Sequence, residues 1–157
     1  MFLCVGVDDF KSENILINNK TRNNIITNSF FYRLYYSNND FISNGVVIVF
    51  QLNDISFEKY FNKNKLIFNS KQNLNIVEKL NNIEDALLQS LKIENKLRKN
   101  LIKEQLDNGF LKIINEKYNI LKKQDKSKII IKISGIWESK TEYGLTFRCI
   151  KTEKQYN

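Results

Sequence analysis

The residue types that most often carry out catalysis are sparse in this chain. Adjacent carboxylates occur at Asp8–Asp9 and at Glu84–Asp85, but neighbouring residues of a strand point to opposite faces, so such a pair rarely shares a metal ion. The chain has no histidine, which removes the commonest general base and the commonest zinc ligand. We therefore expect a non-catalytic protein without a metal or a cofactor. A small metal-dependent nuclease that uses Asp8 and Asp9 is the least favoured alternative.

The two cysteines, Cys4 and Cys149, lie far apart and lack the C-x-x-C spacing of zinc and thiol redox sites. We expect buried thiols in a reducing compartment, and a disulfide between two terminal strands is the alternative. No segment has the flanking charge and length of a signal peptide, and no run approaches the roughly 18 apolar residues of a spanning helix. These features predict an intracellular protein without a membrane partner, in the host cytoplasm or nucleus if the chain is viral.

The charge of the chain favours an acidic partner. It has 25 Lys and Arg against 17 Asp and Glu, for a formal net charge of +8. Such an excess is typical of proteins that bind nucleic acid or anionic surfaces. The alternative is that lysine only solvates the surface of a chain written from an AT-rich genome.

Two segments combine positive charge with aromatic residues, which is the composition of surfaces that bind single-stranded nucleic acid. One is Ser29–Ser37, and the other is Lys128–Lys151, which contains the only tryptophan. Arg33 stands inside an aromatic strand and must reach solvent, an acid or a ligand, so we expect its face to be open to water. A lone tryptophan is more often buried than exposed, so Trp137 contributes only if it is accessible. The candidate nucleic-acid-binding residues are Phe31, Arg33, Tyr35, Lys128, Lys132, Trp137, Tyr143 and Arg148.

Residues 1–53 are expected to be rich in strands. Strand signals cover Phe2–Val7, Asn14–Ile17, Ser29–Ser37 and Gly45–Leu52. We expect the last two to form an antiparallel hairpin across the turn that ends at Gly45. The second of them is almost wholly apolar and predicts a strand covered on both faces.

Residues 55–108 are expected to be mainly helical. Ser56 is a candidate N-cap for a short helix through Phe61. A longer helix is expected from Gln72, because an apolar stripe starts at Ile76 and the Asn108–Gly109 pair supplies a stop. One interpretation is a dimeric coiled coil through Leu80, Ile83, Leu87, Leu97 and Leu101. The other is a break near residues 94 to 96 with the first half packed on the sheet, which we favour because the heptads are not sustained.

The segment Ile133–Phe147 reads I-S-G-I-W, five further residues, and Y-G-L-T-F. It resembles the closing strands of small OB-fold-like single-stranded DNA-binding proteins of large DNA viruses and phages. The resemblance implies binding of single strands without catalysis.

The sequence thus predicts one α+β domain over residues 1–157, with a C-terminal β hairpin at 128–151. Its sheet is expected to be antiparallel or a partly open OB-like barrel, with one long helix packed on or across it. The alternative function is a structural or interaction protein, such as a virion or assembly component, that dimerises through the long helix.

Overall fold

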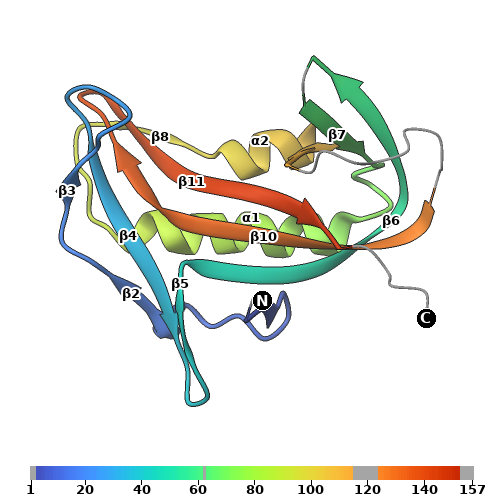
Figure 1. Cartoon of the computed structure of the whole chain (residues 1–157), viewed down its shortest axis with the longest axis horizontal. Helices are drawn as coiled ribbons and strands as arrows, with labels where there is room; N and C mark the ends of the chain where they lie inside the picture. The colour runs from blue at the N-terminus through green and yellow to red at the C-terminus, as the bar shows by residue number, and fades with distance from the viewer. Residues whose placement is uncertain (1–2, 62, 115–123, 153–157) are drawn as a thin grey trace.

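The computed structural model of the protein describes residues 3–61, 63–114 and 124–152. These residues form a large, mostly antiparallel sheet of 11 strands and two α-helices (Figure 1). The strands are β1 (Val5–Gly6), β2 (Ile15–Ile17), β3 (Thr21–Arg22), β4 (Phe30–Ser37), β5 (Ile42–Asn44), β6 (Val46–Tyr60), β7 (Lys63–Ile67), β8 (Leu97–Lys99), β9 (Phe110–Ile113), β10 (Gln124–Glu138) and β11 (Glu142–Lys151). The helices are α1 (Leu74–Gln89) and α2 (Leu101–Asp107), and a short 3-10 helix, η1, spans Ser12–Asn14.

The long strand β10 organises the sheet. One of its edges pairs with β11 over residues 129–138, so the predicted C-terminal hairpin is confirmed. Its other edge pairs first with β6, over residues 124–133, and then with β4, over residues 135–138. The inward residues Ile129, Ile131 and Ile133 lie opposite Phe50, Ile48 and Val46 of β6, and all six are buried.

The remaining strands extend from β6 and β4. β6 pairs with β7, β7 with β9, and β9 runs parallel to the end of β11, so the sequence of pairings returns to β10 and β6. β8 also runs parallel to β11, at its beginning. On the other side, β2, β3 and β5 pair with β4.

The expected hairpin between Ser29–Ser37 and Gly45–Leu52 is wrong. β4 turns at Asn38–Phe41 and pairs with the short β5, and β6 then pairs with β10. Gly45 has φ of 93°, a left-handed conformation that glycine adopts without a steric penalty, and it lies between β5 and β6. The chain changes direction there, which separates β6 from β4.

The short helix expected after Ser56 is also wrong, because β6 continues to Tyr60. Ile55 and Phe57 are buried, whereas Ser56 and Glu58 are exposed. This period of two is that of a strand with one face on the core. The apolar pair therefore outweighs the capping signal of Ser56.

Helix α1 packs on the sheet through Val77, Leu80, Ile83 and Leu87, which belong to the same buried cluster as the strand residues. The preferred packing of its first half is thus confirmed, and a single long helix is wrong. α1 ends at Gln89, Asn95 adopts φ of 61°, and Leu97–Lys99 forms β8. The break expected near residues 94 to 96 is confirmed. Neither helix of the described residues is long and apolar enough to cross a membrane.

Candidate nucleic-acid interface

The register of β4, β10 and β11 places most of the candidate residues on one face of the sheet. Residues directly opposite each other in paired strands point to the same side. Trp137 lies opposite Phe31 of β4 and Gly144 of β11, and Lys132 lies opposite Arg148. Because side chains alternate along β4, Arg33 and Tyr35 share the side of Phe31. We call this side of β4, β10 and β11 the outer face.

Two glycines allow the aromatic rings of the outer face to lie close against the backbone. A Cβ atom at Gly144 would lie 2.9 Å from Cζ2 of Trp137, so the indole covers this glycine. A Cβ atom at Gly135 would overlap the Phe31 ring and the carbonyl oxygen of Tyr32. The sequence therefore needs glycine at both positions to let the rings lie close to the backbone.

The Arg33 side chain is exposed, as its position in an aromatic strand predicts, and Phe31 and Tyr35 are half-buried. Its Nη1 donates a hydrogen bond to Oδ1 of Asn44 at 3.2 Å, and its guanidinium carbon lies 5.6 Å from the centre of the Phe31 ring. This contact is a cation–π pair that keeps the guanidinium over the ring. Arg33 thus remains accessible to a ligand.

Tyr143 departs from the expected set. It lies on the opposite side of β11, is 9% exposed and belongs to the core, so the expectation that it lies on the binding surface is wrong. Trp137 is half-buried, and Lys128 and Arg148 are exposed. Lys132 is half-buried, and its Cε lies 3.3 Å from the position of a Cβ at Gly45.

Next to the outer face lies a cleft of about 730 Å³ that sequence reasoning missed. We call it the basic cleft. It is lined by Lys59, Lys63, Asn64, Leu101, Gln105, Lys112, Ile113, Ile114, Trp137, Leu145, Thr146, Phe147 and Arg148. The β6–β7 hairpin, α2, β9 and β11 all contribute to its walls, and Trp137 and Arg148 connect it to the outer face.

All charged side chains that line the basic cleft are positive. Lys59, Lys63, Lys112 and Arg148 line it, and no acidic residue of the described chain does. All four side chains are exposed, and none forms an ion pair with another described residue. The lysines were missed because Lys59 lay in an expected helix and because pairings of distant strands bring Lys63 and Lys112 together.

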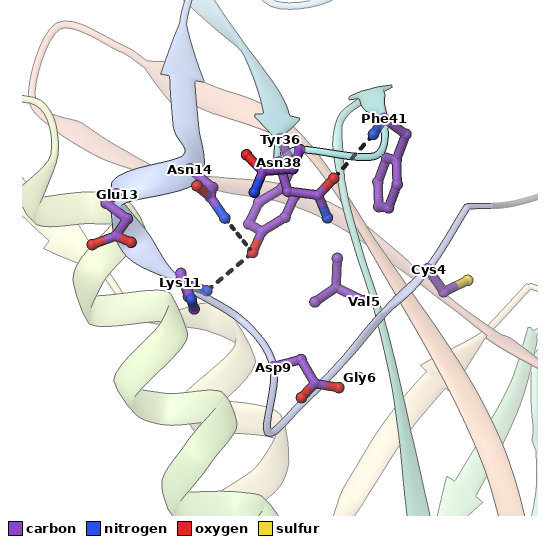
Figure 2. Close-up of a pocket in the computed structure, with 11 residues that line it drawn as sticks. Cys4, Val5, Gly6, Asp9, Lys11, Glu13, Asn14, Tyr36, Asn38 and Phe41 are labelled. Atoms are coloured by element: carbon purple, nitrogen blue, oxygen red, sulfur yellow. Dashed lines mark hydrogen bonds between the residues drawn. The ribbon is translucent and has the colours of Figure 1, made fainter.

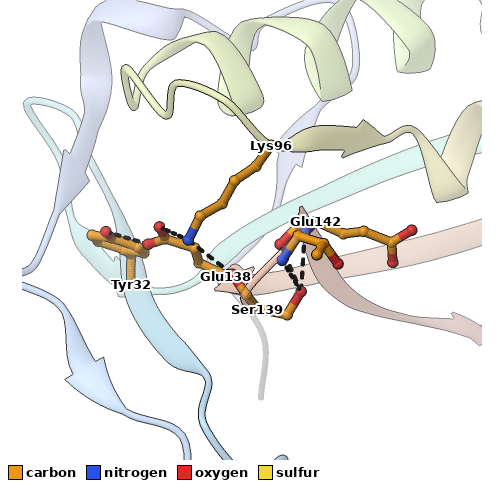
Figure 3. A network of polar contacts seen from close by, with 6 residues as sticks. Tyr32, Lys96, Glu138, Ser139 and Glu142 are labelled. Atoms are coloured by element: carbon orange, nitrogen blue, oxygen red, sulfur yellow. Dashed lines mark hydrogen bonds and ion pairs between the residues drawn. The ribbon is translucent and has the colours of Figure 1, made fainter.

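A partly buried network of polar contacts fixes the end of β10 (Figure 3). Glu138 accepts hydrogen bonds from the Tyr32 hydroxyl at 2.7 Å and from Lys96 Nζ at 2.6 Å, and Lys96 also donates to the carbonyl of Ser139. Burial raises the pKa of Glu138, but the hydrogen bonds from Lys96 and Tyr32 and the positive charges of Lys96 and Lys20 together outweigh it, so the pKa lies below its ordinary value. Burial and the bond to Glu138 raise the pKa of Tyr32 to about 12. The network ties β4 and the segment before β8 to β10.

The α2 wall of the basic cleft is held by a buried carboxylate of α1. Glu84 is fully buried and accepts hydrogen bonds from the backbone N–H groups of Ile102 at 3.0 Å and Lys103 at 2.8 Å. These are donors of the first helical turn, which have no partner within the helix. Burial raises the pKa of Glu84, although these two bonds oppose the shift. The acidic pair at Glu84–Asp85 therefore has a structural use, since Asp85 also accepts from Arg98 and Asn100.

The other acidic pair lies near a second pocket, of about 390 Å³, at the N-terminal part of the chain (Figure 2). Asp9 lines this pocket, and Asp8 forms an ion pair with Lys79 of α1. The hydroxyl of Tyr36 accepts hydrogen bonds there from the backbone of Lys11 and from Asn14. Within the described residues, no group of three or more Cys, Asp or Glu side chains is placed to hold a metal ion.

The residues expected to form a coiled coil do not share one helix. Leu80, Ile83 and Leu87 are buried in the core, whereas Leu97 is an exposed residue of β8 and Leu101 begins α2. The coiled-coil arrangement is therefore wrong, and dimerisation by another surface stays a prediction. Cys149 is buried and is not joined to Cys4 by a disulfide.

Comparisons of this chain with protein-family models, with curated proteins and with solved structures find no match.

Proposed function

We propose that this protein binds single-stranded nucleic acid through the basic cleft and the adjoining outer face. The observation that carries the proposal is a cleft whose four cations lack acidic partners among the described residues and whose wall includes the lone tryptophan. A positive groove beside accessible aromatic rings is the combination that sequence-tolerant binders of single strands use. The cations neutralise phosphates, and the rings stack on bases.

Two further aromatic residues, Phe31 and Phe61, add to the aromatic component. Phe31 lies beside Trp137 on β4, and Phe61 stands between β6 and β7, next to the cleft lysines in sequence, with 82% of its surface exposed. Phe61 has φ of 53°, a conformation that is costly for a bulky residue and is often retained for function. Each base that stacks on an aromatic ring contributes about 1–3 kcal/mol.

We further propose that the closed run of pairings through β6, β7, β9, β11 and β10 is an OB-like barrel. Support comes from the antiparallel β6–β7–β9 meander, the parallel contact of β9 with β11, and the return of β10 to β6. These are the neighbours that the five strands of an OB fold have. One departure is the position of α1 and α2, which lie between the second and third strands of this run, whereas an OB fold usually carries its helix between the third and fourth.

The proposal is tested by titrating the protein with a thymidine oligonucleotide while Trp137 fluorescence is recorded. Binding should quench the signal, and the affinity should fall with salt, with a log–log slope of roughly −3 if all four cleft cations contact phosphates. The double variant Lys63→Ser/Lys112→Ser should bind more weakly and show a slope smaller by roughly half. Lys11→Ser/Lys92→Ser loses the same charge outside the cleft and should behave like the unchanged protein.

If both double variants lose affinity equally, the net charge of the chain and not the cleft determines binding. If the oligonucleotide causes no salt-sensitive change at micromolar protein, the proposed function is wrong.

A further inference from the structure

Within the described part of the chain, the edge of β11 that borders the basic cleft lacks a strand partner over a short stretch. Pairing with β8 ends at Gly144, and pairing with β9 begins at Cys149. Among the described residues, 145–148 therefore have no strand partner on that edge, although β10 pairs with all of them on the other. Leu145 and Phe147 both belong to the lining of the cleft.

The direction of the backbone groups follows from the neighbouring hydrogen bonds. The carbonyl of Thr141 accepts from the N–H of Leu97 at the start of β8, and the carbonyl of Cys149 accepts from the N–H of Ile114, just after β9. Backbone groups alternate between the two edges of a strand, so those of Phe147 face the same edge as those of Thr141 and Cys149. The N–H and C=O of Phe147, and the C=O of Leu145, thus point toward the cleft.

These groups need partners. Backbone donors and acceptors are strong hydrogen-bonding groups, and those near the interior are nearly always paired. Among the described residues, no strand is paired with Phe147 on this edge, and no turn or loop backbone group bonds to it. The gap spans only residues 145–148, roughly 13 Å of strand, and β8 and β9 occupy both of its ends. A continuous added strand would not fit, whereas a planar ring would.

We infer that the open β11 edge binds the Watson–Crick edge of an unpaired nucleobase in the basic cleft. This inference rests on the proposed function and names the part of the ligand that enters the cleft. Every base presents at least one donor beside one acceptor on that edge, so the N–H of Phe147 and a neighbouring carbonyl serve all four bases. The cleft volume of about 730 Å³ lies in the range of small-ligand sites and leaves room for the attached phosphates near Lys63 and Lys112.

A contact with the Watson–Crick edge would also select single strands over duplexes. In a duplex the Watson–Crick edge is already paired, so it cannot reach β11. Because the backbone recognises a feature common to all bases, the site discriminates single strands from duplexes without selecting a sequence.

The experiment compares a thymidine oligonucleotide with one of equal length made from N3-methylthymidine. The methyl group blocks the central donor of the Watson–Crick edge and leaves the phosphates and the stacking face in place. We expect the methylated strand to bind about tenfold more weakly or worse, the loss of one or two buried hydrogen bonds. Equal affinity for the two strands would overturn the inference while leaving the proposed function intact. No binding of either strand would overturn the proposed function itself.

A second measurement places the contact on β11. In protein labelled with ¹⁵N-phenylalanine, the Phe147 amide signal is assigned by its loss in the Phe147→Leu variant. This signal should move on addition of the thymidine strand and stay in place with the methylated one. If the methylated strand binds weakly but the Phe147 amide never moves, the base edge is read elsewhere and the inference is wrong.

Discussion

The buried Glu84 carboxylate should be essential to the stability of α2 and, through it, to the basic cleft. Glu84→Ala leaves the N–H groups of Ile102 and Lys103 without their acceptor. An unsatisfied buried donor costs about 1–3 kcal/mol, so the two together should lower the free energy of unfolding by about 2–6 kcal/mol. This is a large part of the 5–15 kcal/mol that is typical of a folded protein. Urea denaturation followed by circular dichroism measures the change.

Glu104→Ala is the matched control, because Glu104 lies on α2, the helix that Glu84 holds, and is exposed. It should change stability by about 0.5 kcal/mol or less. A Glu84→Ala variant that is as stable as this control would refute the role of Glu84 as an anchor of α2. At temperatures where Glu84→Ala remains folded, it should also bind oligonucleotides more weakly, since Leu101 and Gln105 of α2 line the cleft.

Glu84 also gives stability a pH dependence of defined sign. Burial raises its pKa in the folded protein above the ordinary value of 4.5, which applies to the unfolded chain. As the pH rises through the interval between these two values, the unfolded chain releases the proton first. Stability should therefore fall across that interval and be level above it. Glu84→Gln should lack this decrease, and a variant with the same slope as the unchanged protein would contradict the assignment.

Three further predictions concern other contacts. Gly135→Ala should lower Tm, because its methyl group would overlap the Tyr32 carbonyl and the Phe31 ring; an unchanged Tm would exclude this overlap. Tyr32→Phe should lose about 1 kcal/mol in urea denaturation through its bond to Glu138, and no loss would show that Lys96 alone satisfies the carboxylate. In a Cys4→Ser variant, Cys149 should react with thiol reagents only on unfolding, because burial raises its pKa to about 12; rapid labelling of the folded protein would disprove this.

Local patterns of the sequence identify the individual strands well but not their partners. The aromatic run at Phe30–Ser37 and the isoleucine-rich run before Trp137 are strands as expected. Which strands lie side by side depends on turns such as Gly45, where a single backbone conformation redirects the chain. The pairing of β10 with both β6 and β4 has no local signal in either segment.

The helical region shows why the apolar stripe was misleading beyond Gln89. Leu97 and Leu101 continue the spacing of α1, but neither residue belongs to that helix. The strand β8 gains hydrogen bonds with β11, and Arg98 gains an ion pair with Asp85. These tertiary contacts outweigh helix propensity, which contributes less than about 1 kcal/mol per residue for most residue types.

The candidate site could be predicted only in part, because tertiary contacts between distant segments complete it. Alternation within one strand was enough to group Phe31 with Arg33, whereas the register that places Lys132 opposite Arg148 comes from the structure. The cleft required the approach of Lys63 and Lys112 across β7 and β9, which are separated by two helices in the sequence. Such a cluster of distant lysines has no sequence signature beyond the net charge.

The most direct test of the central claim uses the single tryptophan as a reporter. The side chain of Trp137 gives one indole N–H signal in a ¹⁵N-labelled protein, and Trp137 connects the basic cleft to the outer face. We predict that a single-stranded thymidine oligonucleotide shifts this signal until it saturates, and that a duplex of the same length does not. An indole signal that stays in place while the oligonucleotide binds, or that responds equally to the duplex, would contradict the account.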